Sequence, residues 1–282
     1  MDFFAIPIFI ISYNRLFDLQ KCITRLESDG YKNLIIVDNA STDEPLLDYL
    51  HTIPYKVHFL DKNWGPYVVW KSHLFDDVIL NQYYVVTDPD IIPIENCPSD
   101  YLECFYEILQ EFPSKTKVGF SLKLDDIPDE YQYKYDIWRF ESFYWEKIIK
   151  TKKCIAYDAP LDTTFALYRP VPILSIDGIF MNAIRVGGNY QARHLGWYIT
   201  ELSLEKYGEY YLKSTNGSTS FNNLAMQKAR LEFVANFVSN FDLDICNVTK
   251  SMSRRNILRK TLFYRLFGTF IFVLLKKLQL VF

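Results

Sequence analysis

The chain has 282 residues, of which 49% are hydrophobic, and a formal net charge of −3. This length and apolar content suffice for one large domain or a domain with an appendage, and they exclude a globally disordered chain. The charge is unevenly distributed, because the segment from Lys250 onward carries eight basic residues and no acidic one. Such asymmetry predicts a polyanionic partner for this segment, either a membrane surface or a nucleic acid.

The cysteines and the N-terminus indicate the compartment. Five cysteines are scattered along the chain, and no two of them form a C-x-x-C pair. No basic residue precedes the apolar run near the N-terminus, and no small-residue cleavage site follows it. We therefore expect a reducing, cytoplasmic location, and we expect residues 6–12 to form a buried strand rather than a signal peptide.

The first ninety residues alternate between short β-branched apolar runs and segments in which apolar residues recur at helical spacing. This alternation predicts a doubly wound α/β fold, in which right-handed crossover helices join parallel strands. The expected strands are residues 6–12, 34–37, 57–60 and 83–87. The expected helices follow Arg15, the capping residues Ser41 to Asp43, and a turn at residues 63–66, the last of them running to about residue 80.

The second half is less regular. We expect a helix over residues 101–111, strands over 118–122 and 164–168, and a turn at Gly187-Gly188. The acidic, aromatic region 124–146 predicts no definite structure. One catalytic domain over residues 1–245, divided into halves at residue 92, and a C-terminal helical tail over 246–282 fit this pattern best.

Polar residues follow three of the expected strands. Ser12-Tyr13-Asn14-Arg15 follows the first strand, Asp38 to Asp43 follows the second, and Asp88-Pro89-Asp90 follows the fourth. In open α/β sheets, ligands bind beyond the carboxyl ends of the strands, so the three loops should open on one edge. Two carboxylates at that edge can hold a hard divalent cation, which can bridge a diphosphate. The alternatives are two aspartates in a surface turn for Asp88 and Asp90, and simple helix capping for Ser41 to Asp43.

Together these three strings resemble the nucleotide-binding half of family 2-like GT-A glycosyltransferases, over about residues 5–92. The resemblance implies a GT-A fold, a nucleotide-diphospho-sugar donor such as a UDP-sugar, and a Mn²⁺ or Mg²⁺ ion. It implies inverting transfer of the sugar to a hydroxyl of a glycan or a lipid-linked glycan, as in cell-surface polysaccharide or lipopolysaccharide synthesis.

The resemblance also implies roles for individual residues. Asp38 would contact the base, and Asp88 and Asp90 would serve the metal and the diphosphate. Many GT-A enzymes recruit a histidine as a further metal ligand, and His194 lies at a suitable distance along the chain; a hydrogen-bonded loop histidine is the alternative. The remaining donor-binding candidates are Ser12, Tyr13, Asn14, Arg15 and Asn63.

Inverting transfer needs a carboxylate that deprotonates the acceptor hydroxyl as it attacks the anomeric carbon. We favour Asp162, because it directly precedes an apolar run and can point from a strand edge into the cleft. The family's frequent acceptor-site Glu-Asp pair is not evident, so the choice of base and the choice between inversion and retention both stay open. The other candidates are Glu141, Asp158, Asp125 and Asp126.

The C-terminal tail combines basic and apolar residues. Its apolar stretch, residues 261–275, is shorter than the roughly 20 residues that a membrane span needs. Flanking basic residues suit a helix that lies on an anionic membrane surface, here the inner face of the cell membrane. A helix packed on the domain is the alternative, and nucleic acid is not the expected partner because the apolar face is large.

Two rival functions remain. A sugar nucleotidylyltransferase usually has a glycine-rich phosphate loop with a lysine after its first strand, which Ser12 to Arg15 does not match. A catalytically silent, glycosyltransferase-like subunit that only binds a sugar nucleotide or a glycan belongs to a different class. The presence of Asp88, Asp90 and His194 argues against this second reading.

Overall fold

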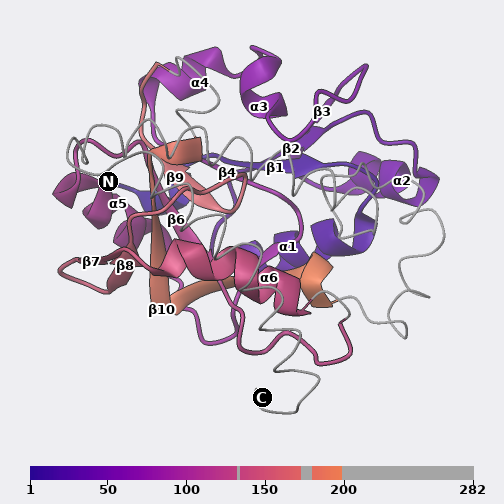
Figure 1. Cartoon of the computed structure of the whole chain (residues 1–282). Helices are drawn as coiled ribbons and strands as arrows, with labels where there is room; N and C mark the ends of the chain where they lie inside the picture. The colour runs from indigo at the N-terminus through magenta and orange to yellow at the C-terminus, as the bar shows by residue number, and fades with distance from the viewer. Residues whose placement is uncertain (132–133, 173–179, 199–282) are drawn as a thin grey trace, which may run out of the picture. The chain divides into compact units, whose positions relative to one another are not determined.

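The computed structural model describes residues 1–131, 134–172 and 180–198 (Figure 1). Within these residues ten strands form one mixed sheet, in the order β3-β2-β1-β4-β9-β6-β10-β8-β7, and β5 pairs with β10. The expected C-terminal tail, residues 246–282, and its boundary with the domain lie outside the described residues.

The strands are β1 (Ile8–Ser12), β2 (Leu34–Asp38), β3 (Lys56–Phe59), β4 (Tyr84–Thr87), β5 (Ile91–Pro93), β6 (Lys117–Leu122), β7 (Ile148–Lys150), β8 (Ile155–Tyr157), β9 (Ala166–Tyr168) and β10 (Ala183–His194). The α-helices are α1 (Leu16–Ser28), α2 (Glu44–Thr52), α3 (Val68–Lys71), α4 (Asp76–Asn81), α5 (Tyr101–Glu111) and α6 (Lys134–Glu141). The 3-10 helices are η1 (Phe3–Ala5), η2 (Ser142–Trp145) and η3 (Leu195–Tyr198).

The first four strands form the parallel part of the sheet. β1 pairs in parallel with β2 on one side and with β4 on the other, and β3 extends the sheet beyond β2. All five residues of β1 are buried, which is the pattern of a parallel strand covered by helices on both faces. The predicted parallel sheet is therefore confirmed, although the whole sheet is mixed because β9 pairs antiparallel with both β4 and β6.

Helices cover both faces of the sheet, as a doubly wound arrangement requires. Ile8 and Ile10 of β1 pack in a core with residues of α1, α2 and α5. Phe9 and Ile11, whose side chains alternate with these, pack in a second core with residues of α3 and α4. Figure 1 shows α3 and α4 on one side of β1 and β4, and α1 on the other.

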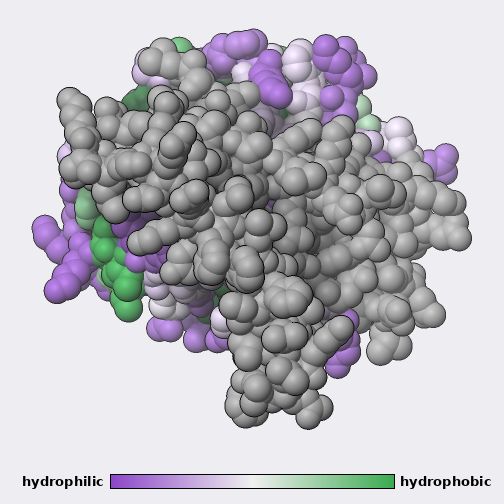
Figure 2. Space-filling view, in the orientation of Figure 1, coloured by the Kyte–Doolittle hydropathy of each residue, from purple (hydrophilic) through white to green (hydrophobic). Residues whose placement is uncertain are grey.

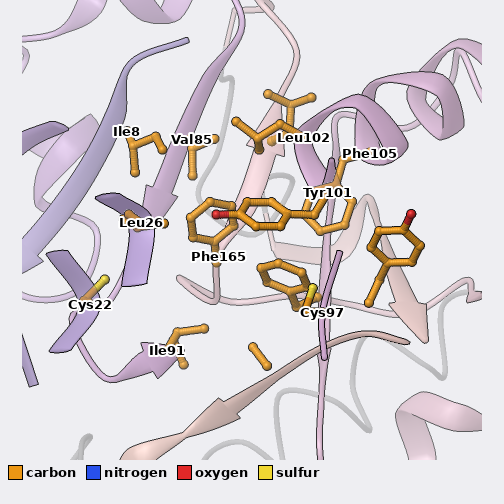
Figure 3. Close-up of a cluster of buried hydrophobic side chains, with 14 of the residues drawn as sticks. Ile8, Cys22, Leu26, Val85, Ile91, Cys97, Tyr101, Leu102, Phe105 and Phe165 are labelled. Atoms are coloured by element: carbon orange, nitrogen blue, oxygen red, sulfur yellow. The ribbon is translucent and has the colours of Figure 1, made fainter. Parts of the chain in front are cut away.

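An aromatic cluster holds α5 on the sheet. Tyr101, the first residue of α5, is fully buried, and its ring lies 5.5 Å edge-on from Phe165 and 5.1 Å from Phe120 (Figure 3). Its hydroxyl donates to the Asp29 carboxylate at 3.2 Å, so the polar tip is satisfied where α1 ends. Edge-to-face pairs of this kind stabilise a core beyond their area of burial.

The predicted helix over residues 66–80 is wrong in one respect, because two short helices, α3 and α4, replace it. His73 lies between them with φ of 57°, and a residue in this left-handed region ends an α-helix. Each short helix buries its own apolar side chains against β1 and β4, among them Trp70 and Ile79.

The predicted turn at Gly187-Gly188 is also wrong. β10 continues through both glycines, and its pairing with β6 shifts between Val186 and Gln191. Gly188 has φ of 67°, which suits the extra residues of a β-bulge. The bulge lets one long strand run from the centre of the sheet to His194.

The region 124–146, for which the sequence predicts no definite structure, contains α6 and η2, and a hairpin of β7 and β8 follows it at the edge of the sheet. The hairpin exposes Ile148 and Ile155, and Figure 2 shows green apolar atoms beside purple polar ones at its place. Among the described residues, no helix has the length and apolar character needed to cross a bilayer.

Candidate functional site

The strand order has a switch point beyond β1 and β4. The chain passes from β1 to β2 on one side, whereas β4 lies on the other side of β1. The loops that follow β1 and β4 therefore diverge, and ligands of open α/β sheets bind at such a switch point. Ser12 ends β1 here and Tyr13 to Arg15 follow it, and Asp88 to Asp90 follow β4.

The loops after β1 and β2 are joined by Asn14. Its backbone N–H donates to Ser41 Oγ at 3.0 Å, and its Oδ1 accepts from the backbone N–H groups of Thr42 and Asp43 at 2.8 and 3.1 Å. Asn14 has φ of 53°, a left-handed conformation that asparagine tolerates better than most residues. The predicted meeting of these two loops at one edge is confirmed.

Asp38, at the end of β2, is 2% exposed. Its carboxylate accepts hydrogen bonds from the backbone N–H of Ser41 at 3.1 Å and from Ser41 Oγ at 2.5 Å. Burial raises the pKa of Asp38, although the two hydrogen bonds from Ser41 oppose this effect. Ser41 thus donates hydrogen bonds to Asp38 and does not cap α2. Asp43 is the N-cap of α2, and its carboxylate accepts from the Leu46 N–H.

Asn63 lies in a loop that is fixed beside β2. Asn39, which follows Asp38, donates from its side-chain amide to Asn63 Oδ1 at 2.9 Å and to Gly65 O at 3.0 Å. The Asn39 side chain also accepts from the Trp64 N–H at 2.8 Å. Asn63 therefore borders the Asp38 loop, and its oxygen is engaged within the protein. Tyr13, the remaining candidate of the first loop, is half-buried.

Asp90 is buried and charged. It is 2% exposed, and its Oδ2 forms an ion pair with Arg15 Nη1. Its other oxygen, Oδ1, is buried and has no hydrogen-bond partner among the described residues. Burial alone would raise the pKa of Asp90, but the charges of Arg15 and His194 outweigh burial and lower it. The sequence did not predict that Arg15, in the loop after β1, would pair with Asp90, in the loop after β4.

Asp88 is anchored to the second half of the chain through Thr163. The Asp88 N–H donates to the Thr163 carbonyl at 2.9 Å, and Thr163 Oγ1 donates to Asp88 Oδ2 at 2.6 Å. Burial and the nearby charge of Asp90 raise the pKa of Asp88. The sequence did not predict that Thr163 binds Asp88. The string Asp162-Thr163-Thr164 stands just before β9, but the sequence does not reveal that β9 pairs with β4.

His194 lies beside Asp90. It ends β10, where it pairs with Ile91 of β5, and its Nε2 is 3.6 Å from Asp90 Oδ2. The ring stacks on Trp197 at 4.9 Å, and its Nδ1 is buried without a partner in the described part of the chain. A Cβ on Gly196 would lie 3.0 Å from the His194 ring, so a larger residue here would press on the imidazole.

The donor atoms of Asp88, Asp90 and His194 are of the types that bind Mn²⁺ or Mg²⁺. Their arrangement does not form a metal site as it stands, because no group of three His, Cys, Asp or Glu side chains within the described ranges is placed to hold a metal ion. The Arg15 guanidinium already neutralises Asp90 Oδ2. Among the described residues, Asp90 Oδ1 and His194 Nδ1 have no hydrogen-bond partner.

Asp162 is exposed, and it precedes Thr163, the residue that is bonded to Asp88. No hydrogen bond or ion pair engages its carboxylate within the residues that the structure describes. Its charge also contributes to the raised pKa of Asp88, so the two carboxylates are close enough to interact. A solvent-facing carboxylate beside the Asp88 loop can accept a proton from a bound hydroxyl.

The other candidate bases are engaged in ion pairs. Glu141 is buried with Arg185, at 2.6 Å between Oε2 and Nη1. Asp158 pairs with Lys115 and Lys147. Asp126 pairs with Arg193 at 2.6 Å, and Asp125 with Lys123 at 2.7 Å.

Two buried cations hold the segment that carries Asp162. Lys117 Nζ donates to the Asp162 carbonyl at 3.3 Å and to the Tyr168 hydroxyl at 3.1 Å. Arg185 Nε donates to the Pro160 carbonyl at 2.6 Å. Burial lowers the pKa of Lys117 to about 7, even though the nearby charge of Asp162 opposes the shift. Neither residue was predicted, because both are single cations inside apolar strands.

No protein-family model matches the chain, and no curated protein matches it. Among solved structures, the chain is similar to a Bacillus anthracis protein assigned as a glucose-1-phosphate thymidylyltransferase, in complex with a sucrose. The TM-score is 0.38 and the identity 13%, over 76% of this chain and 98% of that chain. A similarity of this size assigns neither a family nor an activity, so the function is argued from the site itself.

Proposed function

We propose that the chain is a GT-A-type glycosyltransferase that moves a sugar from a nucleotide-diphospho-sugar, such as a UDP-sugar, to a hydroxyl of a glycan or lipid-linked acceptor. The observation that carries this proposal is the set of buried, unpartnered polar atoms at the switch point. An unsatisfied buried polar group costs about 1–3 kcal/mol, so a cluster of them at one sheet edge supports a polar ligand. At this edge, the atoms without a partner among the described residues are Ser12 Oγ, Asn14 Nδ2, Asp90 Oδ1 and His194 Nδ1.

The charged side chains at this edge would bind two different parts of the donor, the nucleoside and the diphosphate. Asp38, at the end of β2, would accept from the nucleoside, as the resemblance implies. Arg15, in the loop after β1, forms an ion pair with Asp90. Its planar guanidinium can bind a phosphate as well as a carboxylate. The diphosphate would therefore lie beyond the ends of β1 and β4, next to Ser12 and Asn14.

As the resemblance implies, Asp88, Asp90 and His194 would hold a Mn²⁺ or Mg²⁺ ion, and their side chains would have to move to do so, because within the described residues they form no such group. The mixed carboxylate and imidazole donor set and the unused Asp90 oxygen support this assignment. When bound, the cation would neutralise negative charge on the diphosphate leaving group. Arg15 would supply further positive charge from the protein.

Asp162 would act as the base. It would accept the proton of the acceptor hydroxyl, whose oxygen then attacks the anomeric carbon and inverts its configuration. The absence of a partner in the described residues and the bonds from Thr163 to Asp88 support Asp162 over the paired carboxylates. The tail, residues 246–282, would hold the enzyme on the cytoplasmic face of the membrane, near a lipid-linked acceptor.

A donor screen tests the proposal. The full-length protein is incubated with individual nucleotide-sugars and glycan acceptors, with and without Mn²⁺, and the release of nucleotide diphosphate is measured. We expect metal-stimulated release with at least one donor. Release of pyrophosphate from a nucleoside triphosphate and a sugar phosphate would identify a nucleotidylyltransferase instead. Donor binding without any turnover would identify a silent binding subunit.

A further inference from the structure

Two cysteines that are far apart in the sequence meet at the edge of the sheet. Cys104 lies in the second turn of α5 and is fully buried, whereas Cys154, in the turn between β7 and β8, is half-buried. Their Sγ atoms are 3.7 Å apart. A disulfide needs about 2 Å between the sulfurs, so a small rotation of the side chains brings them within bonding distance.

The protein holds Cys154 in this position. Thr151 Oγ1 accepts from the Cys154 N–H at 3.1 Å, donates to the Cys154 carbonyl at 2.7 Å, and lies 3.7 Å from its Sγ. Lys153 Nζ forms an ion pair with Asp100 at 3.0 Å, just before α5 begins. The tip of the hairpin is therefore fixed against the helix that carries Cys104.

The two thiols differ in acidity. The hydrogen bond with Cys104 lowers the pKa of Cys154 to about 7, and Thr151 and Lys153 lower it further. Burial and the charge of Glu111 act in the opposite direction. The same interaction and burial raise the pKa of Cys104. At neutral pH, Cys154 is thus partly thiolate, the nucleophilic form, and Cys104 is a neutral thiol beside it.

We propose that Cys104 and Cys154 are a reversible oxidation site, at which a hydroperoxide converts the pair into a disulfide. The Cys154 sulfur attacks one peroxide oxygen, the O–O bond breaks, and a sulfenic acid forms while hydrogen peroxide yields water after protonation. Cys104 then attacks the Cys154 sulfur, the S–S bond forms, and the sulfenic oxygen leaves as a second water with the Cys104 proton. The pair loses two electrons, which the peroxide gains.

The other described cysteines provide the contrast. Cys22 and Cys97 are buried, and burial raises the pKa of both, that of Cys97 to about 12. The Cys97 thiol donates to the Pro98 carbonyl at 3.6 Å. Cys97 is therefore the matched control, because its buried thiol stays protonated and no contact joins it to another sulfur within the described residues.

The full-length protein is treated with graded hydrogen peroxide, its free thiols are alkylated, and its peptides are mapped by mass spectrometry. We expect one linked pair of peptides, containing Cys104 and Cys154, which dithiothreitol separates. The Cys97→Ser variant should form this link at the wild-type rate. Cys104→Ala should give a sulfenic acid at Cys154, trapped by dimedone, without the link, and Cys154→Ser should leave Cys104 reduced.

The rate of link formation should rise about tenfold between pH 6 and pH 8, in line with the thiolate fraction of Cys154. The proposal is overturned if peroxide that oxidises Cys97 leaves the pair reduced. It is equally overturned if Cys154 accumulates as sulfenic acid in the wild-type protein while Cys104 stays free. Both outcomes are read on the wild-type chain, so they do not depend on the folding of a variant.

Discussion

Glu141 provides a test of the distinction between a structural and a catalytic carboxylate. Glu141 and Arg185 are both 4% exposed at their side chains, and the guanidinium also lies 3.9 Å from the Tyr144 ring. Removal of one charge from a buried ion pair leaves the other uncompensated, at a cost of about 3–5 kcal/mol. Glu141→Gln keeps the shape of the side chain and one acceptor oxygen. We therefore expect the free energy of unfolding to fall by about 3 kcal/mol, the lower end of this range.

Urea unfolding followed by circular dichroism measures this loss. With a slope of about 1–3 kcal/mol per molar urea, the midpoint should fall by about 1–3 M. The matched control is Asp125→Asn, which removes an ion pair with Lys123 at the surface. The Asp125 side chain is 72% exposed, so the loss in the free energy of unfolding should stay below about 1 kcal/mol. Equal losses in the two variants would refute the reasoning. A Glu141→Gln protein that is fully stable but lacks turnover would make Glu141 the base.

The remaining predictions concern the base, a buried lysine and the tail. Asp162→Asn should lower turnover by about 10² with little change in donor affinity and stability, because the exposed carboxylate has no partner among the described residues; unchanged turnover would reject Asp162. The pKa of Lys117 is about 7 in the folded chain against an ordinary 10.5, so the unfolded chain binds more protons between these values, and stability should rise with pH from 7 to 10. Chemical denaturation of Lys117→Met should lack this rise, and an equal rise in both proteins would contradict the assignment. A chain that ends near Val248 should no longer float with anionic liposomes at low salt, whereas the full chain should, and equal flotation would exclude the tail as the anchor.

The first half of the site was largely predictable, because its signals are local. The apolar runs of β1, β2 and β4 are each followed at once by polar residues, and parallel strands bring those residues to one edge. The strings around Asn14 and Asp38 therefore predicted that the two loops meet at one edge of the sheet, and hydrogen bonds through Ser41 join them there. The Asp43 cap of α2 was likewise visible in the sequence.

Two contacts between residues far apart in the sequence were not predictable from local patterns. The ion pair of Arg15 with Asp90 joins residues 75 positions apart, and so does the hydrogen bond of Thr163 with Asp88. Both depend on strand pairing, and β9 is a short antiparallel strand inserted between β4 and β6. A glycine pair such as Gly187-Gly188 marks a turn and a bulge equally well, so the sequence could not reveal that β10 runs on to His194.

Calorimetric titration of a nucleoside diphosphate into the full-length protein, with and without Mn²⁺, tests the central claim most directly. Wild type should bind more tightly with Mn²⁺, and Asp90→Asn should lose most of this gain while its circular dichroism spectrum is kept. Asp129→Asn is the matched control, because its carboxylate lies at the surface in an ion pair with Lys134, and it should bind like wild type. Metal-independent binding that is equal in wild type and Asp90→Asn would contradict the account.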